Sequence, residues 1–494
     1  MPEIPLTPMR TRSEFSRRSF LGAAATIGTA ATTARVLGSA AALVGSRVDL
    51  RAADATTPKA LIQPSAIRSE RGILKTLITA APGNLQLGQH VVSGLLYNGS
   101  YIPPVLRCRL GDTLRITLKN DLPDQPTNLH FHGMSVSPRG NSDNVFIHLH
   151  PGEQFDYVVD VPATGRQGPG FFWYHPHAHG VVDKQVLGGM SGALVVDGIE
   201  RLFPIVGDLP ERFFLLKHFQ VDEENEIISI NGQVGPVIDM RPGEAQFWRI
   251  GNIGAEMFFK FRAEGVRLYA VATDGEPLSR PRPIAELFLG PGERIDVIAV
   301  APQPGAYEMR TIPFPNEAWK KPTPAQKLAT IMCEGPTDNV GSEAAILGQR
   351  VQGERWIDTV RSSPIARRRT FVYSRTADKS EFMINGRIME EDRIDEVARL
   401  GDTEEWTIIN TDQQYHNFHI HQTHFVVTDV NGVPQDEDSM HDTFSVPPAT
   451  ADRPSTLKVV IPFTDPVIVG KFVYHCHAAD HEDKGMMGVI EVVA

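Results

Sequence analysis

Three similar strand patterns, each running from a glycine to an asparagine, constrain the fold of this 494-residue chain most strongly. The patterns occupy residues 111–120, 243–252 and 401–410, and an Asn-Gly pair precedes each of them, at 98–99, 231–232 and 385–386. In each, Gly is followed by an acidic residue and then by alternating polar and apolar side chains. Alternation with a period of two predicts a β-strand that buries one face.

The spacing of these patterns predicts three homologous domains. Their first residues are 132 and 158 positions apart, which is the size of a domain rather than of a solenoid repeat. Gly (42) and Pro (37) together make up about 16% of the chain, above the background of about 12%, and this excess favours many turns between short strands. We therefore expect an all-β protein with three β-sandwich domains, at 56–200, 201–350 and 351–494.

Charge and cysteine content exclude several functions. The formal net charge is −11, and no strongly basic region lies outside the N-terminus, so nucleic acid is not an expected partner. The chain has three cysteines, Cys108, Cys333 and Cys476. Three cannot supply a disulfide scaffold or a four-cysteine zinc site. We expect Cys108 and Cys333 to be buried free thiols, with a bridge between them as the alternative for an exported protein.

The first 55 residues resemble a twin-arginine export signal followed by a linker. Arg17 and Arg18 precede an Ala/Gly-rich stretch that reaches about Val44 and contains one charged residue, Arg35. The pattern predicts a periplasmic or secreted protein that the twin-arginine machinery exports already folded. A membrane anchor is the alternative, although the stretch is only weakly apolar. Cleavage points near residues 40–42 and 53–55 both remain open.

Histidines cluster at equivalent places of the first and third repeats. His130 and His132 follow the first strand pattern, and His419 and His421 follow the third at nearly the same distance. A second His-x-His pair closes each domain, at His175 and His177 and at His475 and His477. The second repeat has the strand pattern but no such histidines.

The His-x-His spacing predicts a metal site. Residues i and i+2 of a strand point to the same face, about 7 Å apart along the chain. Two His-x-His pairs from the first domain and two from the third would bring eight imidazoles to one interface. Neutral imidazoles bind copper, zinc and iron, whereas magnesium and calcium prefer oxygen ligands.

Cys476 predicts a second site, of the mononuclear blue-copper kind. His481 follows it by five residues and Met486 by ten, and His416 precedes His419. Two His, one Cys and a weak axial Met form the blue-copper ligand set. A structural zinc site would require more cysteines, and a nucleophilic role for Cys476 is disfavoured by its position between two histidines.

These motifs together resemble the multicopper oxidases, the laccase-like enzymes with three cupredoxin-like Greek-key β-sandwich domains. The resemblance covers residues 70–494 and implies four copper ions. It implies a type 1 copper at His416, Cys476 and His481 with Met486 axial, and a type 2 copper at His130 and His419. It implies a type 3 pair held by His132, His175 and His477 and by His177, His421 and His475.

The resemblance also implies a reaction. A small donor would give single electrons to the type 1 site, and O2 would be reduced to water at the other three coppers. Asp143 and Glu482 resemble carboxylates that relay protons in the family. Because no Met-rich insertion is present, we favour phenols and aromatic amines as donors, and Cu(I), Fe(II) or Mn(II) is the alternative. We expect a monomer.

Two other classes share the fold. A copper-free structural relative acting in cell division is disfavoured by the complete ligand set, and a copper nitrite reductase by the third domain and the His-Cys-His motif. His148 and His150 form a fifth His-x-His pair without a counterpart in the third repeat, so we expect them on a strand face outside the site. We expect His179, His424 and His441 to hydrogen-bond near the ligands.

Overall fold

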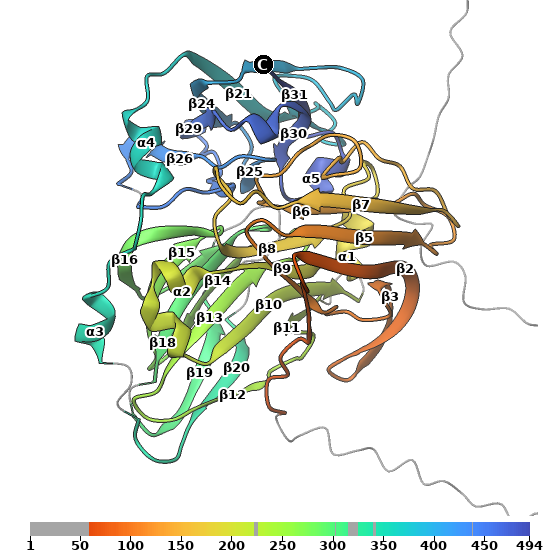
Figure 1. Cartoon of the computed structure of the whole chain (residues 1–494). Coiled ribbons are helices and arrows are strands. Elements are labelled where there is room, and N and C mark those ends of the chain that lie inside the picture. The colour runs from red at the N-terminus through yellow and green to blue at the C-terminus, as the bar shows by residue number, and fades with distance from the viewer. Residues whose placement is uncertain (1–58, 222–225, 302, 315–324, 339–341, 437) are drawn as a thin grey trace, which may run out of the picture. The chain divides into compact units, whose positions relative to one another are not determined.

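Six β-sheets form three sandwiches in the computed structural model, which describes residues 59–221, 226–301, 303–314, 325–338, 342–436 and 438–494. The predicted export signal lies outside these residues. The three sandwiches belong to one compact unit, and Figure 1 shows them in sequence order by colour. The prediction of an all-β protein with three cupredoxin-like domains is confirmed.

The first domain pairs a five-stranded sheet, in the order β1-β4-β9-β8-β6, with a four-stranded sheet, β3-β2-β5-β7. Its strands are β1 (Ala66–Arg68), β2 (Ile73–Leu87), β3 (His90–Tyr97), β4 (Val105–Arg109), β5 (Thr113–Asn120), β6 (His130–His132), β7 (Gln154–Asp160), β8 (Gly170–His175) and β9 (Gly192–Asp197).

The second and third domains have the same strand order. The two sheets of the second domain have the strand orders β11-β10-β13-β18-β15-β16 and β12-β20-β19-β14-β17. The corresponding sheets of the third domain have the orders β22-β21-β24-β29-β26-β27 and β23-β31-β30-β25-β28. The strands of the second domain are β10 (Glu211–Gln220), β11 (Glu226–Ile230), β12 (Val237–Met240), β13 (Ala245–Asn252), β14 (Phe259–Ala263), β15 (Arg267–Thr273), β16 (Glu276–Ile284), β17 (Leu287–Leu289), β18 (Arg294–Val300), β19 (Gly305–Thr311) and β20 (Lys327–Cys333). Those of the third are β21 (Arg367–Arg375), β22 (Phe382–Ile384), β23 (Glu396–Arg399), β24 (Asp402–Asn410), β25 (His416–Ile420), β26 (Val426–Val430), β27 (Val433–Pro434), β28 (Thr443–Val446), β29 (Ser455–Phe463), β30 (Gly470–Cys476) and β31 (Met487–Val493).

Helices are short and lie between strands. They are α1 (Val182–Leu187), α2 (Ile199–Leu202), α3 (Glu343–Leu347), α4 (Trp356–Ser362) and α5 (Ala479–Asp483), with 3-10 turns at Pro204–Asp208 and Pro466–Ile468. Within the described ranges, none of the helices has the length and hydrophobicity needed to cross a bilayer.

The repeated strand patterns become the central strands β5, β13 and β24. Trp248 and Trp406 lie at equivalent positions of β13 and β24, fully buried in the cores of their domains. Each indole N–H donates to the side chain two residues earlier, Gln246 Oε1 at 2.9 Å and Glu404 Oε2 at 2.8 Å. This bond satisfies the one polar group of a large apolar ring, which lets the ring fill the sandwich.

The three Asn-Gly pairs form equivalent hairpin turns. Asn98, Asn231 and Asn385 have φ of 50–52°, and the glycines after them have φ of 69–73°. Positive φ at both central residues defines the turn that matches the right-handed twist of strands, and Asn-Gly is its preferred sequence. Each Asn side chain also accepts a hydrogen bond from a backbone N–H of the neighbouring strand, at 2.7–2.9 Å.

Candidate metal centre

Two antiparallel strand pairs carry the histidine clusters. In the first domain β6 pairs with β8, so that His130 lies opposite His175. In the third, β25 pairs with β30, so that His419 lies opposite His475 and Phe418 lies opposite Cys476. The paired strands therefore bring motifs that are distant in sequence to one sheet surface in each domain. In Figure 1 the four strands lie where the first domain meets the third.

The two surfaces face each other through stacked imidazoles. The ring of His130 stacks on that of His421 with centroids 3.9 Å apart, and His132 stacks on His419 at 4.0 Å. All eight rings are at most 4% exposed. Four groups of three histidines place a ring nitrogen of each member within 4.8 Å of the others: His130, His132 and His175; His130, His419 and His421; His132, His419 and His477; and His177, His421 and His475.

Hydrogen bonds on the outer nitrogens set the protonation of the rings. The Nδ1 atom of His130 lies 3.0 Å from Asp143 Oδ1, that of His175 2.9 Å from the Pro176 carbonyl, and that of His419 2.7 Å from the Asp442 carbonyl. Because these partners are acceptors, each Nδ1 carries the proton and leaves a lone pair on Nε2. The Nε2 atoms of these three rings have no hydrogen-bond partner although they are buried.

The remaining inner nitrogens face one another. His475 Nε2 lies 3.2 Å from Nε2 of both His177 and His421, and His477 Nε2 lies 3.0 Å from His132 Nδ1. His475 donates its Nδ1 proton to the Cys476 carbonyl and His132 donates its Nε2 proton to Asp442, so each of these rings directs a lone pair toward the inner nitrogens. A cation can accept these lone pairs, so the donor set fits metal ions.

Burial keeps the imidazoles neutral. Desolvation, followed by repulsion from neighbouring rings, lowers the pKa of His130, His132 and His421 well below the usual value. The same causes lower the pKa of His175 to about 3. Neutral imidazole is the form that binds metal, so these ligands are available at neutral pH without losing a proton.

Asp143 and Glu482, the two carboxylates singled out in the sequence, border the cluster, and their environments differ. Burial raises the pKa of Asp143 to about 7, although the Phe131 N–H and Gln422 side chain oppose this by hydrogen bonding. Burial also raises the pKa of Glu482, but its interactions with His177 and His475, including a hydrogen bond to His475, outweigh burial and bring the pKa to about 2. Glu482 Oε2 lies 3.1 Å from His475 Nδ1.

A separate triangle of donors surrounds Cys476. Its Sγ lies 3.5 Å from His416 Nδ1 and 3.4 Å from His481 Nδ1, and the two nitrogens are 3.0 Å apart. The Asn417 N–H also donates to the sulfur, at 3.3 Å. Burial raises the pKa of the thiol to about 12, so formation of the thiolate is coupled to binding of a cation.

Met486 is held beside this triangle. It is fully buried in the same core cluster as Cys476. The Cys476 N–H donates to the Met486 carbonyl, and the Met486 N–H donates to the His481 carbonyl, both at 3.0 Å. Two backbone bonds therefore fix the methionine next to the cysteine and one of the histidines.

Strand alternation separates the two sites. Cys476 lies between His475 and His477 on one extended segment, and both histidines contact the eight-imidazole cluster. The cysteine consequently points to the opposite face, where His416 and His481 lie. The two metal sites are thus joined through a single residue's backbone.

The other histidines singled out in the sequence lie outside the cluster. His148 and His150 are exposed on either side of buried Leu149, in a bridge to Thr127, and His148 contacts Glu391 at 2.8 Å. They lie outside the site, as predicted, but not on a strand, because only Leu149 between them forms an isolated bridge. Cys108 and Cys333 are free and buried, as expected.

Sequence reasoning missed three residues that border the cluster, Arg294, Asp442 and Thr443. The Thr443 hydroxyl lies 3.2 Å from His132 Nε2 and 3.0 Å from His419 Nδ1. No spacing in the sequence marks Arg294, because it comes from the domain without histidine pairs.

His424 and His441, which the sequence singled out, are hydrogen-bonding neighbours of the site. The Nδ1 atom of His441 lies 2.9 Å from Asp274 Oδ2.

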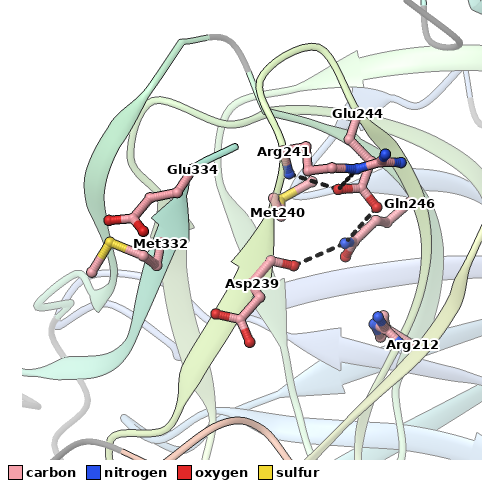
Figure 2. A pocket seen from close by; sticks show the side chains of 8 residues that line it. All are labelled: Arg212, Asp239, Met240, Arg241, Glu244, Gln246, Met332 and Glu334. Carbon is pink, nitrogen blue, oxygen red and sulfur yellow. Dashed lines mark hydrogen bonds and ion pairs between the residues drawn. The ribbon is translucent and has the colours of Figure 1, made fainter. Parts of the chain in front are cut away.

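A cavity of about 290 Å³ opens elsewhere, on the second domain. Figure 2 shows its lining side chains, which come from β10, β12, β13, β20 and the adjoining loops. The lining consists of two arginines, three carboxylates, two methionines and a glutamine: Arg212, Asp239, Met240, Arg241, Glu244, Gln246, Met332 and Glu334. None of them contributes to the histidine cluster or to the cysteine triangle.

The fold and the two sites together define a class of protein. Cupredoxin-like domains that hold a buried Cys-His₂ triangle beside eight imidazoles form a copper-dependent oxidoreductase, because one Cys and two His with a nearby Met are the ligand set of blue copper, whereas structural zinc sites use more cysteines.

Comparison with known proteins identifies the family. Models described as multicopper oxidase match residues 80–201, 209–332 and 363–494. The chain is 24% identical over 459 residues to the multicopper oxidase mco of Staphylococcus haemolyticus, covering 86% of this chain and 90% of that protein. It is 25% identical over 538 residues to the multicopper oxidase MmcO of Mycobacterium tuberculosis, covering 98% of each. A solved multicopper oxidase of Campylobacter jejuni, described as a metallo-oxidase, superposes with a TM-score of 0.75 at 25% identity, over 88% of this chain and 95% of that one. The chain belongs to the multicopper oxidase family.

Proposed function

We propose that this chain is an exported four-copper oxidase that couples one-electron oxidation of phenolic or aromatic amine donors to the reduction of O2 to water. Bound copper would supply the one-electron chemistry and the reduction of O2. The observation that carries the proposal is the set of buried, neutral imidazoles whose unpaired nitrogens face one another beside a separate Cys-His₂ triangle.

The ligand assignment follows the two sites. His416, Cys476 and His481, with Met486 as the axial residue, would hold the type 1 copper. The other three would be held by His130 and His419 (type 2), by His132, His175 and His477, and by His177, His421 and His475 (the type 3 pair). Because the Cys476 backbone leads directly to His475 and His477, it provides the shortest covalent path between the two sites.

The experiment is copper analysis with visible spectroscopy of the full copper-loaded chain. Wild type should bind about four copper ions and be intensely blue. Cys476→Ser should lose the blue band and about one copper, whereas the control Cys108→Ser, which changes another buried free thiol, should retain both. A folded wild type that binds no copper after reconstitution would overturn the proposal.

Asp143 and Glu482 are proposed to move protons to the O2-reducing site. Both are buried, and each contacts a ligand histidine, Asp143 contacting His130 and Glu482 contacting His475. A carboxyl group with a pKa of about 7, as at Asp143, can both accept and release a proton at neutral pH. Glu482 is ionised and can accept one.

The side chains around the type 1 site indicate where the donor would bind. His416 Nε2 lies 3.7 Å from Asp412 Oδ2, and the Asp412 side chain is 17% exposed. The adjacent Tyr415 is half-buried and packs against Phe288 and Phe258 with centroids 5.3 and 5.4 Å away. Partly exposed aromatic rings next to a type 1 ligand favour a donor that can stack.

Oxidation of a metal ion is the second candidate, and Asp412 favours it because a carboxylate beside His416 can bind a cation. However, Arg375 pairs with Asp412 and offsets its charge. In the part of the chain that the structure describes, every cluster of three or more metal-binding side chains belongs to the two proposed copper sites. The similarity to the C. jejuni protein described as a metallo-oxidase is a second reason to test a metal ion as the donor.

Steady-state kinetics with a methoxyphenol and with Fe(II) distinguish the donors. If the proposal is correct, Tyr415→Ala raises KM for the phenol several-fold and Asp412→Asn changes Fe(II) oxidation little. A large loss of Fe(II) oxidation in Asp412→Asn, with phenol oxidation unchanged, would favour the metal ion.

Export is proposed from Arg17 and Arg18, which lie outside the described residues. Replacing both with lysine retains their charge and should leave the protein in the cytoplasm. Cell fractionation measures this, and undiminished export of the Arg17→Lys, Arg18→Lys chain would contradict it.

A further inference from the structure

Asp442 connects histidines that belong to different copper sites of the proposed function. Its Oδ1 lies 3.0 Å from His132 Nε2, on a ring of the first domain. Its backbone carbonyl lies 2.7 Å from His419 Nδ1, in the third domain. The next residue, Thr443, donates to the same Oδ1 at 2.8 Å. Asp442 is itself fully buried, so an ionised side chain there needs a countercharge.

Arg294, from the second domain, supplies that countercharge. Its Nη1 and Nη2 donate to the two carboxylate oxygens of Asp442, each at 2.7 Å. Its Nε donates to the Phe171 carbonyl of the first domain at 3.2 Å, and its side chain is 0% exposed. The fork of the guanidinium matches the carboxylate in two parallel bonds, a geometry that lysine cannot reproduce. This ion pair therefore joins all three domains at the edge of the imidazole cluster.

The backbone after His132 is shaped around the pair. Gly133 has φ of 83°, and a Cβ placed on it would lie 2.4 Å from Asp442 Oδ2 and 2.5 Å from Arg294 Nη2. Only a residue without a side chain allows the pair to approach His132 this closely.

The bond to Asp442 determines which nitrogen of His132 faces the cluster. Because the carboxylate accepts the Nε2 proton, the lone pair lies on Nδ1, which is 3.0 Å from His477 Nε2. Without Arg294 the carboxylate would lose two hydrogen bonds and its countercharge, and it would turn away from His132. That movement removes the constraint on His132.

We propose that Arg294 is a positioning residue for the three-copper site: through Asp442 it fixes the orientation of His132 and thereby which of its ring nitrogens faces the cluster. The domain that lacks copper ligands thereby determines how tightly copper is held between the other two. The proposal depends on the copper sites assigned above and adds a residue outside the ligand set.

The test is competition with a copper chelator on the copper-loaded full chain, read by copper per chain and by the blue band. Loss of an outer partner of a metal-bound histidine typically weakens metal affinity about 10- to 100-fold. Arg294→Met should therefore lose the copper of the eight-histidine cluster at a correspondingly lower chelator concentration, while the blue band of the Cys476 site persists. Asp442→Asn, which keeps the volume and the backbone carbonyl, should shift in the same direction.

Arg249→Met is the matched control. Arg249 is an equally buried arginine of the second domain, paired with Asp296 at 2.7 Å and Glu211 at 2.6 Å. Its removal should lower the unfolding temperature of the copper-free protein without changing the chelator titration.

The outcomes separate the two proposals. The positioning role alone would be overturned if the wild type loads copper normally and Arg294→Met, or a folded Asp442→Asn, resists the chelator as well as the wild type does. A wild type that never binds copper would overturn the proposed function instead. Equal loss of copper in Arg249→Met and Arg294→Met would show a general effect of instability and would also overturn the positioning role.

Discussion

The carboxylate of Asp143 lies 3.0 Å from Nδ1 of His130, and both side chains are almost completely buried. The same oxygen accepts the Phe131 N–H, and the other oxygen accepts the Gln422 amide at 2.8 Å. Asp143 is therefore held in place by three donors while its pKa is raised to about 7. This combination suits a group that transfers protons at a fixed position.

We predict that Asp143→Asn slows O2 consumption by about 100-fold or more, because an amide cannot replace a general acid-base group. Oxygen uptake with excess donor measures the effect, together with copper content. Asp156→Asn is the control, since Asp156 is an exposed residue of the same domain. Unchanged turnover in Asp143→Asn with normal copper content would rule out the relay.

Met486→Leu should raise the potential of the type 1 site. A thioether stabilises the oxidised ion more than an apolar side chain does, so its loss favours reduction. Redox titration of the blue band measures the shift. Met487→Leu, at the adjacent and similarly buried position, should leave the potential unchanged. An unchanged potential in Met486→Leu would show that the axial assignment is wrong.

Glu293→Gln should make stability less dependent on pH. Burial, followed by the charge of Asp274, raises the pKa of Glu293 to about 7. A carboxyl group whose pKa is higher folded than unfolded favours folding at low pH, and stability falls as pH rises from about 4.5 to about 7. Removing the charge should raise the free energy of unfolding by about 3 kcal/mol at pH 8 and change it little at pH 4.

Chemical denaturation of the copper-free protein at both pH values measures this difference. The glutamine can preserve the existing bonds, with its oxygen accepting the Gly290 N–H and its amide donating to the Ser445 hydroxyl. Equal stability changes at pH 4 and pH 8 would contradict the prediction.

Lys217→Met should destabilise the contact between the first two domains. The Nζ atom of Lys217 donates to the carbonyls of Tyr101, Gly189 and Ser191 at 2.6, 2.9 and 3.0 Å. Leaving three buried carbonyls unpaired should cost about 3 kcal/mol or more. Thermal unfolding measures the loss. Lys260→Met removes a partly exposed ion pair with Glu286 and should cost less than about 1 kcal/mol; an equal effect in both would contradict the prediction.

The strand pattern made much of the fold predictable. Gly-to-Asn alternation and Asn-Gly turns are local features, and they led to strands β5, β13 and β24 and to the hairpins before them. The shared strand order of the second and third domains could not be predicted from the pattern, since it depends on which strands pair across long connections.

The donor atoms of the candidate site were also visible in the sequence. The His-x-His spacing places two imidazoles on one strand face, and the residue between His475 and His477 must then point the other way. These conclusions need only the geometry of a single strand, so they hold before any tertiary contact is known.

By itself, the sequence therefore determined the donor residues, their division into two clusters and the covalent link between those clusters. Only the tertiary structure decided which nitrogen of each ring faces the cluster, because that depends on acceptors such as Asp143 and the Asp442 carbonyl. It alone brought Arg294 to Asp442, across domains. The physical reason is that strand geometry is local, whereas hydrogen bonds between domains depend on packing that no sequence spacing encodes.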